Sequence, residues 1–189
     1  MKKLIAILSL FLIYSLSYGQ APKNILITYY SKTGNTKSLA EAIANGAKSV
    51  SGVKLTIKTI EQTTHKDLLL ADAIIVGSPV YNANAAPEVI KFMSEWPFEG
   101  TPLKDKIGAA FVTAGGISAG EELVQVNLLH SMMIFGMIVV GGDNWTSAFG
   151  ASAITGEGVY QNNKQVDSLF SKKGYGLGKR VAELCKKIN

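Results

Sequence analysis

The feature that most constrains this chain is a junction between a strand and a helix close to its start. Residues 24–30, Asn-Ile-Leu-Ile-Thr-Tyr-Tyr, form an apolar run that is typical of a buried strand. Residues 37–44 carry apolar side chains at helical spacing. The loop between them is rich in small hydroxyl residues and contains one glycine; it consists of Ser31, Lys32, Thr33, Gly34, Asn35 and Thr36.

This loop predicts a binding site for an anion. The first N–H groups of a helix have no intrahelical partners, and the helix dipole adds partial positive charge there. Ser31, Thr33 and Thr36 can add hydroxyl donors. An ordinary capped helix start is the alternative, because Ser and Thr are common caps. Hydroxyls at three of six positions, together with Gly34, favour a phosphate site.

The first 20 residues differ in character from the rest of the chain. Lys2 and Lys3 precede an apolar run over residues 4–16, and small residues follow around residues 17–19. This pattern predicts a secretory signal peptide, and the run is shorter than the about 20 residues of a membrane-spanning helix. We therefore expect a signal peptide at residues 1–20, a mature domain at residues 21–189, and an exported, periplasmic or secreted, protein without a stable membrane anchor.

Composition indicates a single folded domain with a substantial core. The 189 residues are 47% hydrophobic and only 17% charged, which argues against disorder. Removal of Lys2 and Lys3 lowers the formal net charge from +5 to +3, and no basic cluster supports a nucleic-acid partner. Cys185 is the single cysteine, so it cannot form an intramolecular disulfide, and we interpret it as a small buried hydrophobe.

Strand-like and helix-like segments alternate along the mature chain. We expect strands at residues 24–30, 53–60, 73–77, 106–113 and 137–141, and helices up to residue 48 and at residues 66–70, 86–95, 121–134 and 174–188. Five strands separated by helices, several of them apolar on both faces, predict an α/β fold: a doubly wound parallel sheet with helices on both faces. Residues 141–167 are the one long segment expected to be irregular.

Ligands of open parallel sheets bind at the carboxyl ends of the strands, where the winding direction reverses. In the strand order 2-1-3-4-5, the first, third and fourth strands are neighbours, so the loops that follow them would converge. The first loop is suited to phosphate, the second presents a proline, a tyrosine and two asparagines over residues 77–84, and the third is glycine-rich over residues 113–120. Together these loops predict a phosphorylated planar cofactor.

At this point a family resemblance is evident in residues 31–36, 77–81, 113–116, 135–141, 149–152 and 177–182. The chain resembles the flavodoxin-like superfamily, and within it the FMN-dependent NAD(P)H:quinone oxidoreductases of the tryptophan-repressor-binding-protein type. The resemblance covers essentially the whole mature chain. It implies a flavodoxin-like five-stranded parallel sheet of order 2-1-3-4-5.

The resemblance also implies FMN as the cofactor. Residues 31–36 would hold its phosphate, and the isoalloxazine ring would be bordered by Pro79, Val80, Tyr81, Asn82, Thr113, Ala114, Gly115 and Gly116. NADH or NADPH would donate electrons, and a quinone or similar small molecule would accept them. A flavodoxin-type electron carrier without its own substrate is the alternative, and a binding module without flavin is a third possibility.

Two departures from the reductase pattern concern the site. The third loop of those reductases is longer and richer in glycine, whereas Ile117, Ser118 and Ala119 interrupt it here. The reductases also tend to have a histidine near the flavin, directly before the strand at residues 137–141, and Phe135 occupies that position.

The remaining candidate residues allow more than one interpretation. Tyr81 can pack on the rim of the site or stack on the flavin. Trp145 and Phe149 can line a substrate pocket or fill an interface between subunits, which would make the protein a homo-oligomer. Residues 174–178, Gly-Tyr-Gly-Leu-Gly, are interpreted as a closely packed helix start. No metal-ligand spacing and no nucleophile–base arrangement is present, and flavin chemistry requires neither.

Overall fold

The structure, a computed structural model, describes residues 21–161 and 165–188. The predicted signal peptide, residues 1–20, lies outside the described residues. Five parallel strands form the main path of the sheet in the order β2 (Val53–Thr59), β1 (Lys23–Tyr29), β3 (Ala73–Tyr81), β5 (Ile107–Ala114) and β6 (Ile138–Val139). Numbered along the chain, this is the order 2-1-3-4-5, so the predicted strand order is confirmed. Two further strands, β4 (Asn84–Ala85) and β7 (Ala151–Ile154), bring the sheet to seven strands rather than the predicted five.

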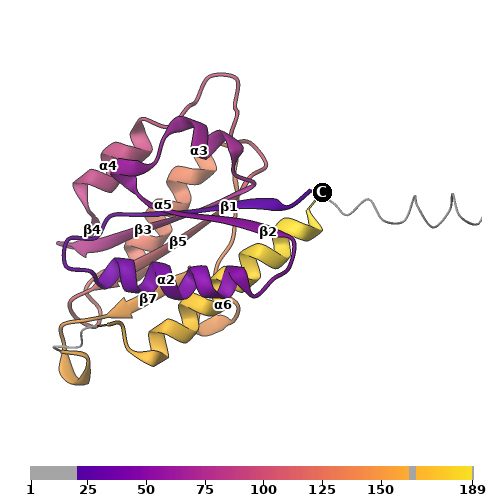
Figure 1. Ribbon diagram of the computed structural model, residues 1–189. Helices are drawn as coiled ribbons and strands as arrows, with labels where there is room; N and C mark the ends of the chain where they lie inside the picture. Colours follow the sequence, from indigo (N-terminus) through magenta and orange to yellow (C-terminus); the bar gives the residue numbers. More distant parts are fainter. Residues whose placement is uncertain (1–20, 162–164, 189) are drawn as a thin grey trace, which may run out of the picture.

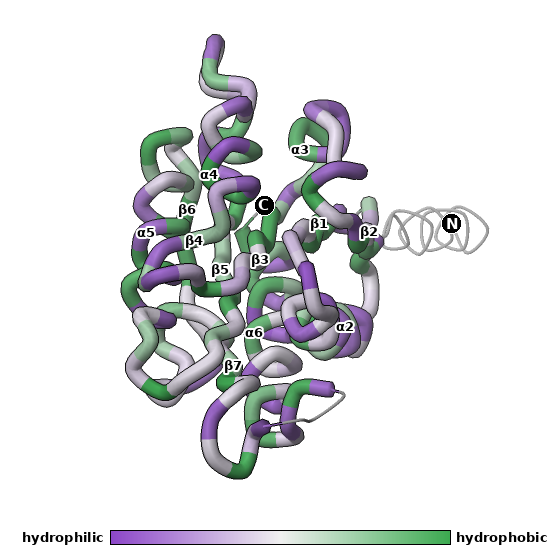
Figure 2. The backbone as a smooth tube through the Cα atoms, turned by 90° about the vertical axis from the view of Figure 1, so that its left-hand side faces the viewer, coloured by the Kyte–Doolittle hydropathy of each residue, from purple (hydrophilic) through white to green (hydrophobic). Residues whose placement is uncertain are grey.

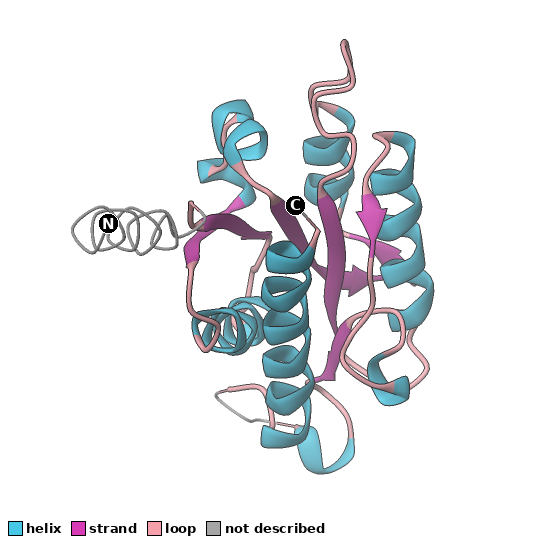
Figure 3. Cartoon of the chain, turned by 90° about the vertical axis from the view of Figure 1, so that its right-hand side faces the viewer, coloured by secondary structure: helices cyan, strands magenta, loops and turns pink. Residues whose placement is uncertain are grey.

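Helices cover both faces of the sheet (Figure 1; Figure 3). One layer consists of α2 (Asn35–Lys48) and α6 (Ser168–Lys187), and the other of α3 (His65–Leu70), α4 (Pro87–Ser94) and α5 (Glu121–Ile134). The central strands are apolar on both faces because each face is covered by a helical layer. Figure 2 shows the hydrophobic residues along these strands between helices of mixed character. No helix of the described residues combines the length and apolar character needed to cross a bilayer.

The edge strand beyond β5 differs from its prediction, because it is split in two. β6 pairs only with Ile107 and Gly108, whereas β7 (Ala151–Ile154) pairs with the second half of β5. The predicted strand at residues 137–141 is therefore too long, and the segment predicted as irregular contains a strand. It also contains two short 3-10 helices, η2 (Trp145–Ser147) and η3 (Gly158–Tyr160).

The excursion between β6 and β7, residues 140–150, folds back on itself and onto α6. A side chain at Gly142 would approach the Ser147 hydroxyl oxygen to 2.2 Å, so only glycine fits this close turn. The guanidinium of Arg180 on α6 donates hydrogen bonds to the carbonyl oxygens of Gly141 and Gly142. The sequence pattern alone does not show these contacts, which hold the segment between β6 and β7 against α6.

The last helix begins earlier than predicted. The side chain of Asp167 caps it by accepting the N–H of Leu169 at 2.8 Å, so α6 starts at Ser168 and the glycines of residues 174–178 lie inside the helix rather than at its start. Their close packing is confirmed. A Cβ on Gly178 would lie 1.9 Å from the carbonyl oxygen of Ile43 on α2, and one on Gly46 would lie 1.9 Å from the Tyr175 carbonyl oxygen.

We predict that Gly178→Ala destabilises the protein. The added methyl group must push α6 away from α2, and such overpacking costs about 2 kcal/mol of unfolding free energy. The matched control is Gly115→Ala, because a Cβ at Gly115 meets no atom within 4 Å. Urea unfolding followed by circular dichroism should show the loss for Gly178→Ala and a change within about 0.5 kcal/mol for the control; equal midpoints for the two variants would contradict the packing argument.

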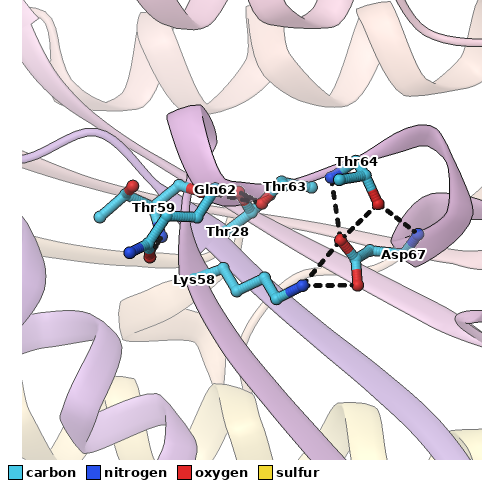
Figure 4. A network of polar contacts seen from close by, with 7 residues as sticks. All are labelled: Thr28, Lys58, Thr59, Gln62, Thr63, Thr64 and Asp67. Carbon is cyan, nitrogen blue, oxygen red and sulfur yellow. Dashed lines mark hydrogen bonds and ion pairs between the residues drawn. The ribbon is translucent and has the colours of Figure 1, made fainter.

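A polar network joins the exposed edge of the sheet to α3 (Figure 4). The Lys58 ammonium lies 2.8 Å from the Asp67 carboxylate. Asp67 also accepts the N–H of Thr64, the residue that caps the start of α3. Thr63, which follows the 3-10 helix η1 (Ile60–Gln62), shares a hydroxyl hydrogen bond of 2.8 Å with Thr28 of β1. Two hydrogen bonds lower the pKa of Asp67 from 3.8 to about 2: the larger effect comes from Lys58 and the smaller from the Thr64 backbone.

This lowered pKa predicts a defined pH dependence of stability. Asp67 stabilises the fold fully above its ordinary pKa of 3.8, and the contribution is lost as the pH falls toward about 2. Asp67→Asn should therefore lower the unfolding free energy by about 1 to 2 kcal/mol at neutral pH, with the difference from wild type shrinking between those two pH values. Unfolding curves at stepped pH measure this difference, with Glu99→Gln, at an exposed carboxylate, as the control; a constant difference across the window would contradict it.

Candidate cofactor site

The loop after β1 forms the first wall of the candidate site. Gly34 precedes α2 with a φ of 93°, a left-handed conformation that glycine adopts without strain. Ser31 accepts the N–H of Lys37 at 3.2 Å through its hydroxyl oxygen. Among the described residues, no group accepts a hydrogen bond from the N–H of Asn35 or Thr36, and the first turn of α2 has no acidic side chain. The helix start therefore offers free donors to an anion.

Thr36 connects this wall to the end of β5. Its side chain is 2% exposed, and its hydroxyl oxygen lies 2.8 Å from the hydroxyl oxygen of Thr113, which is 4% exposed. Two buried hydroxyls that pair in this way are held in fixed positions, because breaking the pair leaves a buried polar group unsatisfied. This buried hydrogen bond therefore joins the first and third loops, which are 77 residues apart in sequence at this contact.

The second loop is a hairpin, because the strand that was predicted to end at residue 77 continues further. β3 continues through Pro79 to Tyr81 and pairs in antiparallel fashion with the two-residue strand β4 (Asn84–Ala85). The two residues of the turn, Asn82 and Ala83, have φ values of 50° and 59°, the signs required by a type I′ turn. Tyr81 is 37% exposed on this hairpin.

The third loop, residues 115–120, packs directly on this hairpin. A Cβ on Gly120 would lie 2.7 Å from the Cβ of Ala83, so glycine is needed where the two loops touch. Gly115 is exposed, and a Cβ there would meet nothing within 4 Å. The predicted convergence of the three loops is confirmed by this contact and by the Thr36–Thr113 hydrogen bond.

Two acidic residues that the sequence analysis missed lie at the same edge. The Glu157 carboxylate accepts the N–H of Ile117 at 2.6 Å from the segment that follows β7. Glu88, in the first turn of α4, lies near the Tyr30 hydroxyl, and its carboxylate is the main cause that raises the pKa of that tyrosine. Neither carboxylate belongs to a recognisable motif, because the residue that each one affects is distant from it in the sequence.

Other predicted residues lie away from the three loops. Trp145 and Phe149 occupy the excursion beside α6, and Trp145 is 86% exposed, so they form no cover over the site. Phe135 follows α5 at the amino ends of the strands, opposite the loops, where it contacts Trp96 and Phe98. The replacement of the histidine by Phe135 therefore does not alter the carboxyl edge of the sheet, where the three loops lie.

One cavity of about 310 Å³ is lined by α4, α5 and the hairpin strand β4, and another of about 420 Å³ by η1, α3 and α4. A third, of about 290 Å³, borders the third loop at Ser118 and Gly120. None of these three cavities is lined by a predicted cofactor residue. Within residues 21–161 and 165–188, no group of three or more His, Cys, Asp or Glu side chains is arranged to hold a metal ion.

The residues present fit a phosphorylated planar group. The free N–H groups of Asn35 and Thr36 match the phosphate oxygens, which accept hydrogen bonds and carry the charge that the helix start favours. The open surface at Gly115 lets a flat ligand approach the backbone closely. The fold is thus that of a flavodoxin-like α/β protein, with a candidate ligand site at the carboxyl edge of the sheet.

Comparisons with known proteins place the chain more closely. A family described as NADPH-dependent FMN reductase matches residues 61–152. The chain is 31% identical over 169 residues to a flavodoxin from Aquifex aeolicus, covering 84% of this chain and 85% of the relative. It therefore belongs to the flavodoxin family.

Two further matches are more distant. An NAD(P)H dehydrogenase (quinone) from Azorhizobium caulinodans is 29% identical over 141 residues, covering 62% of this chain and 69% of the relative. The crystal structure of a flavodoxin, WrbA-like protein from Agrobacterium tumefaciens superposes with a TM-score of 0.72 at 20% identity, covering 88% of this chain and 99% of that one. The latter confirms the flavodoxin-like fold.

Proposed function

We propose that this protein is an FMN-dependent oxidoreductase that passes electrons from NADH or NADPH to a quinone or a similar small acceptor. The observation that carries the proposal is the start of α2, where free N–H groups, Gly34 and the buried Thr36 hydroxyl lie beside the third loop and would together form a phosphate cradle. FMN, when bound, supplies the redox chemistry. The protein's part is to hold the phosphate, orient the ring and leave one face accessible.

The choice of donor and acceptor is supported by the description of one matching family and the name of one relative. The match to an NADPH-dependent FMN reductase family and the relative named NAD(P)H dehydrogenase (quinone) both point to a nicotinamide donor. The net charge of +3 expected for the mature chain also favours an enzyme, because electron carriers of this family are usually strongly acidic and dock on basic partners.

A flavodoxin-type electron carrier is the second candidate, and one structural observation favours it. Trp145 and Phe149 do not cover the three loops, so a cofactor bound there would present its edge to a partner protein rather than to an enclosed substrate pocket. The Aquifex aeolicus relative is named as a flavodoxin.

The proposed localisation and the proposed association of copies of the chain are based on the sequence. Export after removal of residues 1–20 would place the protein where reduced nicotinamides are scarce, so FMN and the electron donor would both have to be acquired outside the cytoplasm. The exposed Trp145 is the proposed centre of an interface between copies of the chain, because exposed aromatic side chains are enriched at interfaces.

The phosphate cradle predicts a ligand-specific loss in a threonine variant. Thr36→Val keeps the side-chain volume but removes one hydroxyl donor, so FMN binding should weaken by about ten- to a hundredfold, while riboflavin, which has no phosphate, should bind almost as before. Quenching of flavin fluorescence during titration measures both dissociation constants.

Thr113→Val is the matched control for that experiment. It breaks the same 2.8 Å hydroxyl pair but leaves the Thr36 hydroxyl in the cradle. Its effect on FMN and on riboflavin should be similar. If Thr36→Val weakens both flavins equally, the loop does not hold the phosphate.

The enzyme and carrier assignments are separated by a steady-state assay of the mature protein loaded with FMN. We expect oxidation of NADH or NADPH, followed at 340 nm, only when benzoquinone is also present. A protein that oxidises neither NADH nor NADPH, yet passes electrons to an acceptor protein after chemical reduction, would be a carrier. A protein that remains colourless after incubation with FMN would be neither.

A further inference from the structure

Two carboxylates accept hydrogen bonds from the backbone of the third loop. Glu157, beyond β7, accepts the N–H of Ile117 at 2.6 Å, and Glu121, at the start of α5, accepts the N–H of Ser118 at 3.3 Å. Ile117 and Ser118 are two of the residues that interrupt the glycine-rich pattern of the loop. Their N–H groups are thus engaged within the protein.

Glu157 reaches the loop because the chain after β7 continues alongside the chain after β5. The N–H and the hydroxyl of Thr155 both donate to the carbonyl oxygen of Ala114, at 2.9 and 3.1 Å. One residue further, a Cβ on Gly156 would lie 2.8 Å from the carbonyl oxygen of Gly115. The carboxylate of Glu157 then lies against Gly116, where a Cβ would be only 2.9 Å away.

The loop needs such support because its backbone is strained. Ser118 has a φ of 59°, a left-handed conformation that is costly for a residue with a Cβ. Hydrogen bonds from backbone N–H groups to ionised carboxylates are among the stronger ones in proteins, so they can offset this cost. The hairpin turn at Ala83 closes the remaining side of the loop against Gly120.

The contacts leave a particular pair of donors free. Among the described residues, no group accepts a hydrogen bond from the N–H of Gly115 or Gly116, whereas the next two N–H groups are both taken by carboxylates. Gly115 also has open space beside it. The free donors therefore lie at the part of the loop that a flat ligand can approach.

We propose that Glu157 is a positioning residue of the cofactor site, assisted by Glu121. By engaging Ile117, it fixes the third loop so that the N–H groups of Gly115 and Gly116 donate to a carbonyl oxygen on the edge of the flavin ring. This inference rests on the proposed binding of FMN. It assigns a ring-orienting role to a residue that lies 40 positions away from its hydrogen-bond partner in the sequence.

The experiment uses the mature protein with and without FMN and compares Glu157→Ala, Glu157→Gln and the control Glu122→Ala, at an exposed carboxylate next to Glu121. Without FMN, hydrogen exchange followed by mass spectrometry should be faster at the hydrogen-bonded N–H groups of Ile117 and Ser118 in Glu157→Ala than in the wild type or in Glu122→Ala. With ligand, Glu157→Ala should weaken FMN and riboflavin alike by about tenfold, because one hydrogen-bonded contact to the ring is lost. Glu157→Gln keeps an oxygen acceptor and should restore part of both effects.

Two results would overturn the assignment. Unchanged exchange in Glu157→Ala would mean that the carboxylate does not order the loop, and tighter FMN binding would mean that it competes with the ligand for the Ile117 N–H. A wild-type protein that binds no flavin would instead overturn the proposed function. The exchange measurement on the ligand-free protein distinguishes these cases, since it tests the loop without FMN.

Discussion

The close approach of α2 and α6 is the constraint on which the candidate site depends. Gly46 and Gly178 have no side chain at the two points where each helix touches the backbone of the other. This packing fixes the position of α2 against the sheet and therefore the position of its first turn at the end of β1. A phosphate cradle made of backbone N–H groups is only as well placed as the helix that carries it.

The rest of the site is assembled by contacts between the loops themselves. The Thr36–Thr113 pair joins the first loop to the third, and the Gly120–Ala83 contact joins the third loop to the hairpin. Because each contact is buried or tightly packed, the loops act as one preorganised unit. Such preorganisation lowers the entropy that a ligand must lose on binding.

The charge distribution differs between the two ends of the candidate site. The start of α2 is free of acidic side chains and suited to an anion, whereas Glu121 and Glu157 lie at the third loop. At the proposed site, a phosphate and a flat aromatic ring would therefore meet different surroundings. This division matches a ligand whose charge is concentrated at one end, as it is in FMN.

The sequence by itself determined the alternation of strands and helices and the loop at residues 31–36, because these depend on local hydrophobic period and on residue types near one another. The sheet order was predicted through the family resemblance. Only the tertiary structure decided that the edge strand splits, that residues 77–84 form a hairpin and that α6 begins at Ser168. It also brought Glu157 to Ile117 and Thr36 to Thr113, pairs separated by 40 and 77 residues. Such contacts depend on strand register and helix packing, which no local pattern encodes.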